Sequence, residues 1–264
     1  MKTANTHLVY YSATYTTRKI VREIARRLGG NVTEHDMTCH AQHTGTTELA
    51  PDDLLVAGVP VYAGRVPAAA AEAIARFRGN STPAIVVCVY GNRDYEDALL
   101  ELKSIVETGG FVAAGAAAFV AQHSIFSSIA AGRPDDSDIR LIRHFADSCA
   151  AALAAAENAA GLGSFTVRGN RPYKTPGVIP LYPSAEEATC TMCGLCASLC
   201  PENAINADEP CRTDTGRCIS CGRCVAVCPH NARKFSGTLD EQTLPKFTAA
   251  FSARKEPEIF LPES

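Results

Sequence analysis

The chain has 264 residues, with 25 lysines and arginines against 28 aspartates and glutamates, which gives a formal net charge of −3. That length suits one ordinary domain and a smaller one. The arginines are dispersed and form no basic stripe, which argues against a nucleic-acid-binding surface. No stretch approaches the roughly 18 uninterrupted apolar residues of a membrane-spanning helix, so no span is expected. Twelve cysteines and no apolar export signal favour a reducing compartment, and we expect a cytoplasmic protein.

Strands and helices alternate along the first 160 residues. Apolar runs predict an edge-like strand at 32–37 and buried strands at 7–11, 54–59, 84–89 and 111–120. Helical spacing occurs at 20–28, 68–77, 98–106 and 135–160. This alternation predicts an α/β fold with a doubly wound parallel sheet of five strands. Ligands of such sheets bind outside the carboxyl ends of the strands, so we expect the loops after the strands to form one site.

The loop after the first strand is rich in hydroxyl groups, at Ser12, Thr14, Tyr15, Thr16 and Thr17. A strand, a hydroxyl-rich turn and a helix start together make an anion site, because backbone N–H groups and the helix dipole face the ligand. Neutral hydroxyl donors suit a phosphate monoester. The alternative is that Ser12 or Thr14 only caps the helix. A Walker A loop and the G-x-G-x-x-G fingerprint are both absent.

A connector rich in proline and glycine follows the α/β region. Residues 161–187 include Pro172, Pro176, Pro180 and Pro183. This composition predicts an extended, fairly stiff linker. Such a linker would hold two domains at a high effective concentration.

Eight cysteines form two runs with the spacing C-x2-C-x2-C-x3-C-P, and the second run starts 28 residues after the first. The runs are Cys190, Cys193, Cys196 and Cys200, then Cys218, Cys221, Cys224 and Cys228. Three thiolates at this spacing can wrap a cubane iron–sulfur cluster, and the proline after the fourth turns the chain away. Structural zinc is an alternative, although it favours cysteine pairs in one tetrahedron. A disulfide framework is the other, and it would suit a small secreted domain.

Two further features of the C-terminal part are Cys211 and the tail that follows the second cysteine run. Cys211 stands between the runs and breaks their register, so we expect a packed or free thiol there rather than a ligand. Residues 238–254 are compatible with one tail helix that packs back on the chain. The sequence of that tail indicates no function.

Both halves of the chain and their connector resemble known families. Residues 5–160 look like a flavodoxin domain, whose first loop follows S/T-x-T-G-x-T; Ser12, Thr14 and Thr17 match, and Tyr15 stands where glycine is usual. The segments PVYAGRVP at 60–67, YGNRDY at 90–95 and GNRPY at 169–173 are similar to those of flavodoxin–ferredoxin fusions of the EFR1 family. The cysteine runs resemble those of bacterial-type ferredoxins, in which the fourth cysteine of each run ligates the other cluster.

This resemblance implies a flavodoxin-like sheet with the strand order 2-1-3-4-5, followed by a small α+β ferredoxin domain with two [4Fe-4S] clusters. It also implies FMN, with its phosphate on Ser12, Thr14, Tyr15, Thr16 and Thr17. The ring would be flanked by residues of the later loops, namely Pro60, Val61, Tyr62, Ala63, Gly64, Tyr90, Gly91, Asn92, Arg93, Tyr95 and His123. One cluster would be held by Cys190, Cys193, Cys196 and Cys228, and the second by Cys218, Cys221, Cys224 and Cys200.

Individual roles follow for the residues around the implied flavin ring. Because the chain has no tryptophan, stacking falls to Tyr62, Tyr90 or Tyr95, and we favour Tyr62 and Tyr95. The alternative is that these tyrosines are ordinary loop residues with half-buried rings and solvent-exposed hydroxyl groups. Asn92 is a candidate to bond the ring edge and set its electronics. His123 is a candidate for a flavin contact, with a structural role as the alternative.

These inferences divide the chain into an FMN-binding domain at 1–160, a linker at 161–187, a two-cluster domain at 188–237 and a tail at 238–264. The first functional hypothesis is a cytoplasmic electron carrier of anaerobic metabolism. Electrons would pass between FMN and redox partner proteins, such as ferredoxin-dependent oxidoreductases, through the clusters. No acid–base dyad is evident, which favours a carrier over an enzyme. The alternatives are a flavoenzyme that reduces a quinone, a nitro compound or oxygen, and a redox sensor or docking subunit of a larger complex.

Overall fold

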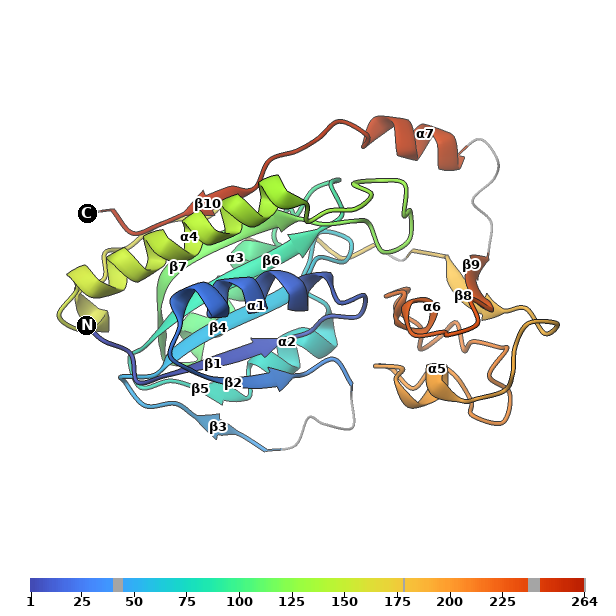
Figure 1. Ribbon diagram of the computed structural model, residues 1–264, viewed down its shortest axis with the longest axis horizontal. Helices are drawn as coiled ribbons and strands as arrows, with labels where there is room; N and C mark the ends of the chain where they lie inside the picture. Colours follow the sequence, from blue (N-terminus) through green and yellow to red (C-terminus); the bar gives the residue numbers. More distant parts are fainter. Residues whose placement is uncertain (40–44, 178, 237–242, 264) are drawn as a thin grey trace.

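The computed structural model describes residues 1–39, 45–177, 179–236 and 243–263. A six-stranded sheet with the order β10-β7-β6-β4-β1-β2 forms the centre of the α/β part of the chain, called here the first domain, and β10 comes from the tail (Figure 1). Five strands are parallel, and they are β1 (Asn5–Tyr10), β2 (Asn31–Asp36), β4 (Leu54–Pro60), β6 (Thr82–Tyr90) and β7 (Phe111–Val120). The two-residue strands β3 (Thr47–Glu48) and β5 (Phe77–Arg78) pair with each other in a separate sheet. Without them, the five parallel strands follow the expected order 2-1-3-4-5, the flavodoxin-like arrangement.

Helices cover both faces of the sheet. Helices α1 (Thr16–Leu28) and α4 (Asp136–Ala155) pack on one face, and α2 (Ala68–Ile74) and α3 (Ala98–Thr108) pack on the other. Each face therefore has its own apolar core, and strand β4 between them is buried on both sides. Continuous burial explains why the sequence LLVAGVP of β4 shows no polar alternation.

Close packing of α1 on the sheet depends on Gly58 in β4. A Cβ atom built on Gly58 would lie 2.4 Å from Cγ1 of Val21. Real side chains do not approach this closely, so any larger residue would push α1 outward. Gly58 thereby helps to fix the position of the hydroxyl-rich loop at the start of α1.

Two predicted helices are shorter than expected. The helix expected at 68–77 ends at Ile74, because Phe77 enters strand β5. The helix expected at 135–160 ends at Ala155, and a 3₁₀ turn (Ala159–Gly161) follows. The side chain of Asn158 caps this turn by accepting a hydrogen bond from Gly161 N. A local cap therefore interrupts a segment whose alanine-rich composition favours a continuous helix.

The linker is docked on the first domain rather than suspended between domains. Asp97, at the start of α3, accepts hydrogen bonds from the backbone N–H groups of Asn170 at 2.8 Å and Lys174 at 2.7 Å. The Tyr173 hydroxyl lies 3.1 Å from Ser104 Oγ on α3. These contacts fix the described part of the linker along α3.

The C-terminal unit, called here the cysteine-rich domain (residues 182–236), contains an internal structural repeat. Met192 and Ser220 share a left-handed backbone conformation, with φ of 57° and 56°, and Gly194 and Gly222 share φ of 73° and 76°. A short helix follows each glycine, and a two-stranded sheet joins the ends of the domain. These elements are β8 (Tyr182–Ala185), α5 (Leu195–Ser198), α6 (Arg223–Ala226) and β9 (Arg233–Ser236). The sequence repeat is thus also a backbone repeat.

The tail returns to the first domain. Helix α7 (Thr243–Ala250) is shorter than the helix expected at 238–254, of which residues 238–242 lie outside the described part. Beyond it, β10 (Glu258–Phe260) pairs antiparallel with β7, so the sheet has one more strand than the sequence predicted. Figure 1 shows the tail in red running along the outer edge of the sheet beside α4.

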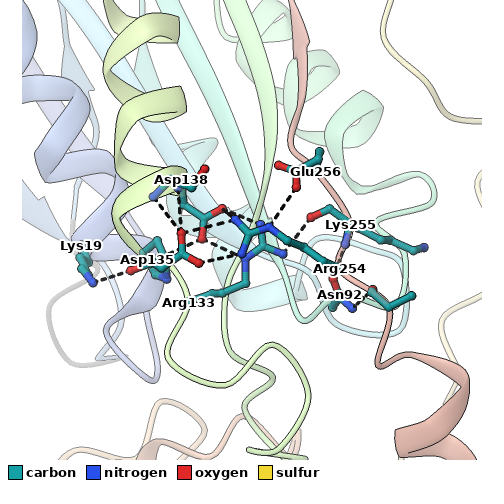
Figure 2. Close-up of polar contacts among 11 residues, drawn as sticks. Lys19, Asn92, Arg133, Asp135, Asp138, Arg254, Lys255 and Glu256 are labelled. Atoms are coloured by element: carbon teal, nitrogen blue, oxygen red, sulfur yellow. Dashed lines mark hydrogen bonds and ion pairs between the residues drawn. The ribbon is translucent and has the colours of Figure 1, made fainter.

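Charged side chains at the start of α4 hold this tail (Figure 2). The buried pair Arg133–Asp138 is joined by two hydrogen bonds of 2.9 and 2.5 Å. Arg254 of the tail reaches Asp135 at 2.7 Å and Asp138 at 3.1 Å. Arg133 also donates to the backbone carbonyl of Lys255 at 2.8 Å. The same carboxylates cap α4, so one cluster of charges fixes both the helix start and the tail.

None of the helices in the described part of the chain has the length and apolar character needed to cross a membrane.

Candidate functional site

The cysteine-rich domain brings the first predicted ligand set together. Cys190, Cys193, Cys196 and Cys228 all line one small cavity, beside Pro210. Three of these residues come from the first run and one from the end of the second, as the crossed arrangement requires. The donor set at this cavity is therefore four thiols, which suits an iron–sulfur cluster.

The second predicted set is also close together. Burial raises the pKa of the Cys221 thiol, and the nearby thiols of Cys224, Cys200 and Cys218 raise it further. Burial likewise raises the pKa of Cys224 to about 11. Metal binding requires thiolates, so loading this site must release protons. Backbone N–H groups point at two of the sulfurs, Ser220 N to Cys218 at 3.4 Å and Ala204 N to Cys200 at 3.3 Å.

The disulfide framework that the sequence left as an alternative is not present in the structure. All twelve cysteines lie in the described part of the chain, and none forms a disulfide. Cys211 lies in hydrogen-bond contact with Cys190, a neighbour that the sequence did not predict.

The hydroxyl-rich loop after β1 keeps a glycine-like backbone. Tyr15 has φ of 67°, in the left-handed region that usually requires glycine, and its ring is exposed. Ser12 is buried, and its Oγ accepts a hydrogen bond from Arg18 N at 3.0 Å. Tyr15, the residue before α1, provides no side-chain cap, so the N–H groups of Thr16 and Thr17 stay available to an anion. The alternative is therefore confirmed in part, because Ser12 Oγ caps the third N–H group of α1, that of Arg18.

The later loops surround a cavity of about 380 Å³, called here the interdomain cavity. Eight of the predicted ring-flanking residues line it: Val61, Tyr62, Ala63, Gly64, Tyr90, Gly91, Arg93 and His123. Its opposite wall comes from the linker, from Ile219 and Ser220 of the second cysteine run, and from Phe247 of α7. This volume is in the range of small-molecule sites. The sequence missed the opposite wall, because nothing in a periodic pattern links these distant segments.

Three predicted ring-flanking residues do not line this cavity. Tyr95 is fully buried, with the Arg168 guanidinium 4.0 Å from its ring centroid and its hydroxyl 2.6 Å from Glu258. Asn92 donates to the backbone carbonyls of Phe251 and Ala253 in the tail. Pro60 ends strand β4 and is likewise absent from the lining. The expectation that Tyr95 stacks on a bound ring is corrected, because its faces are already occupied by protein.

Both cysteine runs match the family model for the 4Fe-4S binding domain. The matched residues are 185–206 and 212–234, so each run lies in its own copy of the model. Two 4Fe-4S clusters fit these two copies, and the cysteine-rich domain is called the 4Fe-4S domain from here on. No curated protein matches the chain.

Solved structures resemble the chain only distantly. The rubredoxin oxygen:oxidoreductase from the anaerobe Desulfovibrio gigas shares 16% identity with a TM-score of 0.43, over 58% of this chain and 37% of its own. A flavodoxin from Streptococcus pneumonia shares 19% identity with a TM-score of 0.41, over 56% of this chain and 99% of its own. The flavodoxin-like topology assigned above rests on the strand order of this chain.

The 4Fe-4S domain touches the first domain through its second cysteine run. Cys221 is part of the same apolar core as Tyr11 and Val59, and it is almost fully buried. The hydroxyl of Tyr11 is buried beside Cys221 without a hydrogen-bond partner. An orphaned hydroxyl at this position fits a sulfur-rich acceptor, since hydrogen bonds to sulfur tune cluster potentials.

His123 is a histidine of the interdomain cavity whose ring stays neutral. Burial, with a smaller contribution from the charge of Arg93, lowers the pKa of His123 to about 4. Its Nδ1 accepts hydrogen bonds from Ile125 N at 3.1 Å and Phe126 N at 3.2 Å. The neutral ring therefore carries its proton on Nε2. At neutral pH this site presents an uncharged imidazole, not a cation.

Proposed function

We propose that the protein transfers electrons between FMN bound to the first domain and the two clusters of the 4Fe-4S domain. The observation that carries the proposal is the burial of Cys221 in the core of the first domain, with Ile219 and Ser220 on the wall of the interdomain cavity. A cluster held by the second set would then adjoin a ligand in that cavity. Electron exchange needs such proximity and no catalytic acid or base.

The residues around the sheet edge support FMN as that ligand. FMN couples one-electron and two-electron chemistry when bound. The free N–H groups at the start of α1 and the hydroxyls of Ser12, Thr14 and Thr17 suit its phosphate. Tyr62 and Tyr90 offer aromatic surface to its ring, and neutral His123 adds no charge.

The same features support a proposal for the family, the compartment and the redox partners of this protein. We place the chain with the flavodoxin–ferredoxin fusions of the EFR1 family, in the cytoplasm and in anaerobic metabolism. Its partners would be ferredoxin-dependent oxidoreductases or other redox proteins. The exposed Cys193 lines the first cavity, so a cluster there would lie near solvent and accept electrons from a docked partner.

Anaerobic purification followed by a reductive titration tests the proposal. Absorption spectra count flavin, iron analysis counts clusters, and EPR spectra follow each cluster as it is reduced. We expect one flavin and two cubane clusters in each chain, with reduction potentials close enough for exchange in both directions. A colourless preparation, zinc in place of iron, or clusters without flavin would contradict it.

A second cavity favours the flavoenzyme as the runner-up function. This cavity has a volume of about 610 Å³ and shares Tyr62, Ile219 and Ser220 with the interdomain cavity. A small acceptor could enter there beside the ring. Steady turnover of a quinone or nitro compound, with a saturable KM and reduced ferredoxin as donor, would support this function. Slow oxidation by every acceptor alike would favour the carrier.

A further inference from the structure

One arginine of the 4Fe-4S domain reaches the hydroxyl-rich loop of the first domain. Arg223 lies directly before Cys224 and begins helix α6. Its Nη1 donates to the backbone carbonyl of Ala13 at 3.2 Å, and its guanidinium carbon is 4.7 Å from the centroid of the Tyr15 ring. The preceding Gly222 is so close that a Cβ built on it would lie 3.4 Å from Thr14 Cγ2.

The charge of Arg223 is buried and incompletely paired. The residue is only 6% exposed, and its Nε has no hydrogen-bond partner. Its side chain also contacts the Cys39 thiol, but among the ion pairs of the described residues none includes Arg223. A cluster on Cys221 and Cys224 would supply negative charge nearby, but the Nε of Arg223 stays a buried donor without an acceptor, and such a donor is costly.

The position of the Arg223 guanidinium raises the free-energy cost of burying it. It sits against the loop that leads into α1, where the helix dipole is positive and the first N–H groups lack intrahelical acceptors. A cation and a helix N-terminus repel each other. An anion between them would satisfy the unpaired Nε, the free N–H groups and both positive charges at once.

We propose that Arg223 binds the phosphate group of the ligand held by the hydroxyl-rich loop, so that the 4Fe-4S domain completes this anion site. The identification of that ligand as FMN rests on the proposed function. Tyr15 has a part in the arrangement, because its left-handed backbone presents the ring on which Arg223 stacks. The phosphate thus bridges the two domains, and ligand binding strengthens their docking to the same degree that docking strengthens ligand binding.

Comparing FMN with riboflavin, which lacks the phosphate, isolates this contact. The full-length, cluster-loaded protein is freed of flavin and titrated with each ligand by flavin fluorescence. We expect Arg223→Gln to weaken FMN binding by about 10- to 100-fold, the usual value of a charge-assisted hydrogen bond, and to change riboflavin binding little. Arg212→Gln is the matched control, because the Arg212 side chain is 83% exposed in the same domain. Iron content confirms that both variants keep two clusters.

Arg223→Lys covers the case in which Arg223→Gln fails to assemble. Lysine keeps the charge but loses the fork that contacts Ala13 O and the anion together, so the preference for FMN over riboflavin should fall relative to Arg212→Lys. An unchanged preference would overturn the proposal. An equal loss of FMN and riboflavin affinity would also overturn it, because Arg223 would then act through docking alone.

Inorganic phosphate separates this proposal from the proposed function. Stabilisation of the wild-type protein by phosphate, measured as a shift in Tm, should shrink in Arg223→Gln but not in Arg212→Gln. If the ligand is not FMN, this difference persists while FMN fails to bind. If FMN binds but neither FMN nor phosphate binding depends on Arg223, the inference is wrong and the proposed function stands.

Discussion

His123 shows how a single buried side chain makes the protein sensitive to acid. The unfolded chain takes up a proton on this histidine near pH 6.5, whereas the folded protein does so only near pH 4. Between these values the unfolded state binds more protons, so stability falls as the pH drops. Above pH 7 neither state is protonated and the effect vanishes.

We predict that the wild-type protein loses about 2 kcal/mol of stability between pH 7 and pH 5 through His123 alone. His123→Asn should remove this loss, because an asparagine oxygen can replace Nδ1 as acceptor for Ile125 N and Phe126 N without titrating. The measurement is urea unfolding at several pH values, followed by far-UV circular dichroism. Parallel pH profiles for the two proteins would show that His123 is not buried in its neutral form.

The types of residues in the sequence predicted the chemistry of the site well, but they predicted the orientation of individual side chains poorly. The thiols of both cysteine runs gather as their spacing indicated, because the ligand set is encoded within short segments. Tyr95 and Asn92 instead face protein, since their partners, Arg168 and the tail, lie far away in the sequence. The sequence predicts the loop in which such a residue lies. It does not predict which distant segment packs against that residue in the folded protein.

At the scale of elements, the contact between α1 and β4 sets the position of the hydroxyl-rich loop. We predict that Gly58→Ala destabilises the protein by about 1–3 kcal/mol, because the new methyl group overlaps Val21. Adding Val21→Ala should recover most of the loss by vacating that space. Guanidinium unfolding measures both, and Gly177→Ala is the control, because a Cβ there meets nothing within 4 Å. Equal effects of Gly58→Ala and Gly177→Ala would contradict the close packing.

The tail is held by Asn92, which makes three hydrogen bonds to the backbone of Phe251, Ala253 and Lys255. We predict that Asn92→Gly costs about 2–3 kcal/mol and speeds proteolysis within residues 243–263. Glycine tolerates the φ of 62° at this position, so the change removes the hydrogen bonds without backbone strain. Asn203→Gly is the matched control, because Asn203 is exposed and has φ of 49°. An intact tail in Asn92→Gly would show that β10 and the contacts of Arg254 hold it without Asn92.

Elements with strong local signals were predictable from the sequence. β7 begins and ends where its apolar run does, and the parallel order follows from strands that alternate with helices. β10 was not predictable, because three residues carry no periodicity and the pairing partner lies about 140 residues earlier. The end of α4 was missed because an asparagine cap outweighed the helix propensity of alanine.

At the scale of the whole molecule, the two cysteine sets are not equivalent. Cys221 of the second set is buried against the first domain, whereas Cys193 of the first set is exposed. We predict that Cys196→Ala and Cys224→Ala each lose about half of the iron, because each removes one ligand of one cluster. Flavin binding should survive in Cys196→Ala, since the first domain has its own core.

The kinetic consequence distinguishes these two variants. The cluster left in Cys196→Ala adjoins the first domain, so it should reduce the flavin faster than the cluster left in Cys224→Ala. Stopped-flow mixing with a reduced donor, monitored at flavin wavelengths, gives the comparison. The reverse order would place the first cysteine set nearer the flavin and reject the proposed route.

The contacts between the two domains could not be predicted from the sequence. Linker composition predicted an extended segment, and the structure shows Asn170 and Lys174 of this segment hydrogen-bonded to Asp97. The contact of Arg223 with Ala13 joins residues 210 positions apart, and no local pattern encodes such a pair. Specific contacts between domains depend on surfaces that exist only after each domain has folded.

The return of the chain to pair β10 with β7 has a consequence for biosynthesis. The ribosome completes β7 first and then makes the whole 4Fe-4S domain before it reaches the strand that covers the edge. At usual translation rates the edge stays bare for on the order of ten seconds, with its N–H and C=O groups open to other nascent chains.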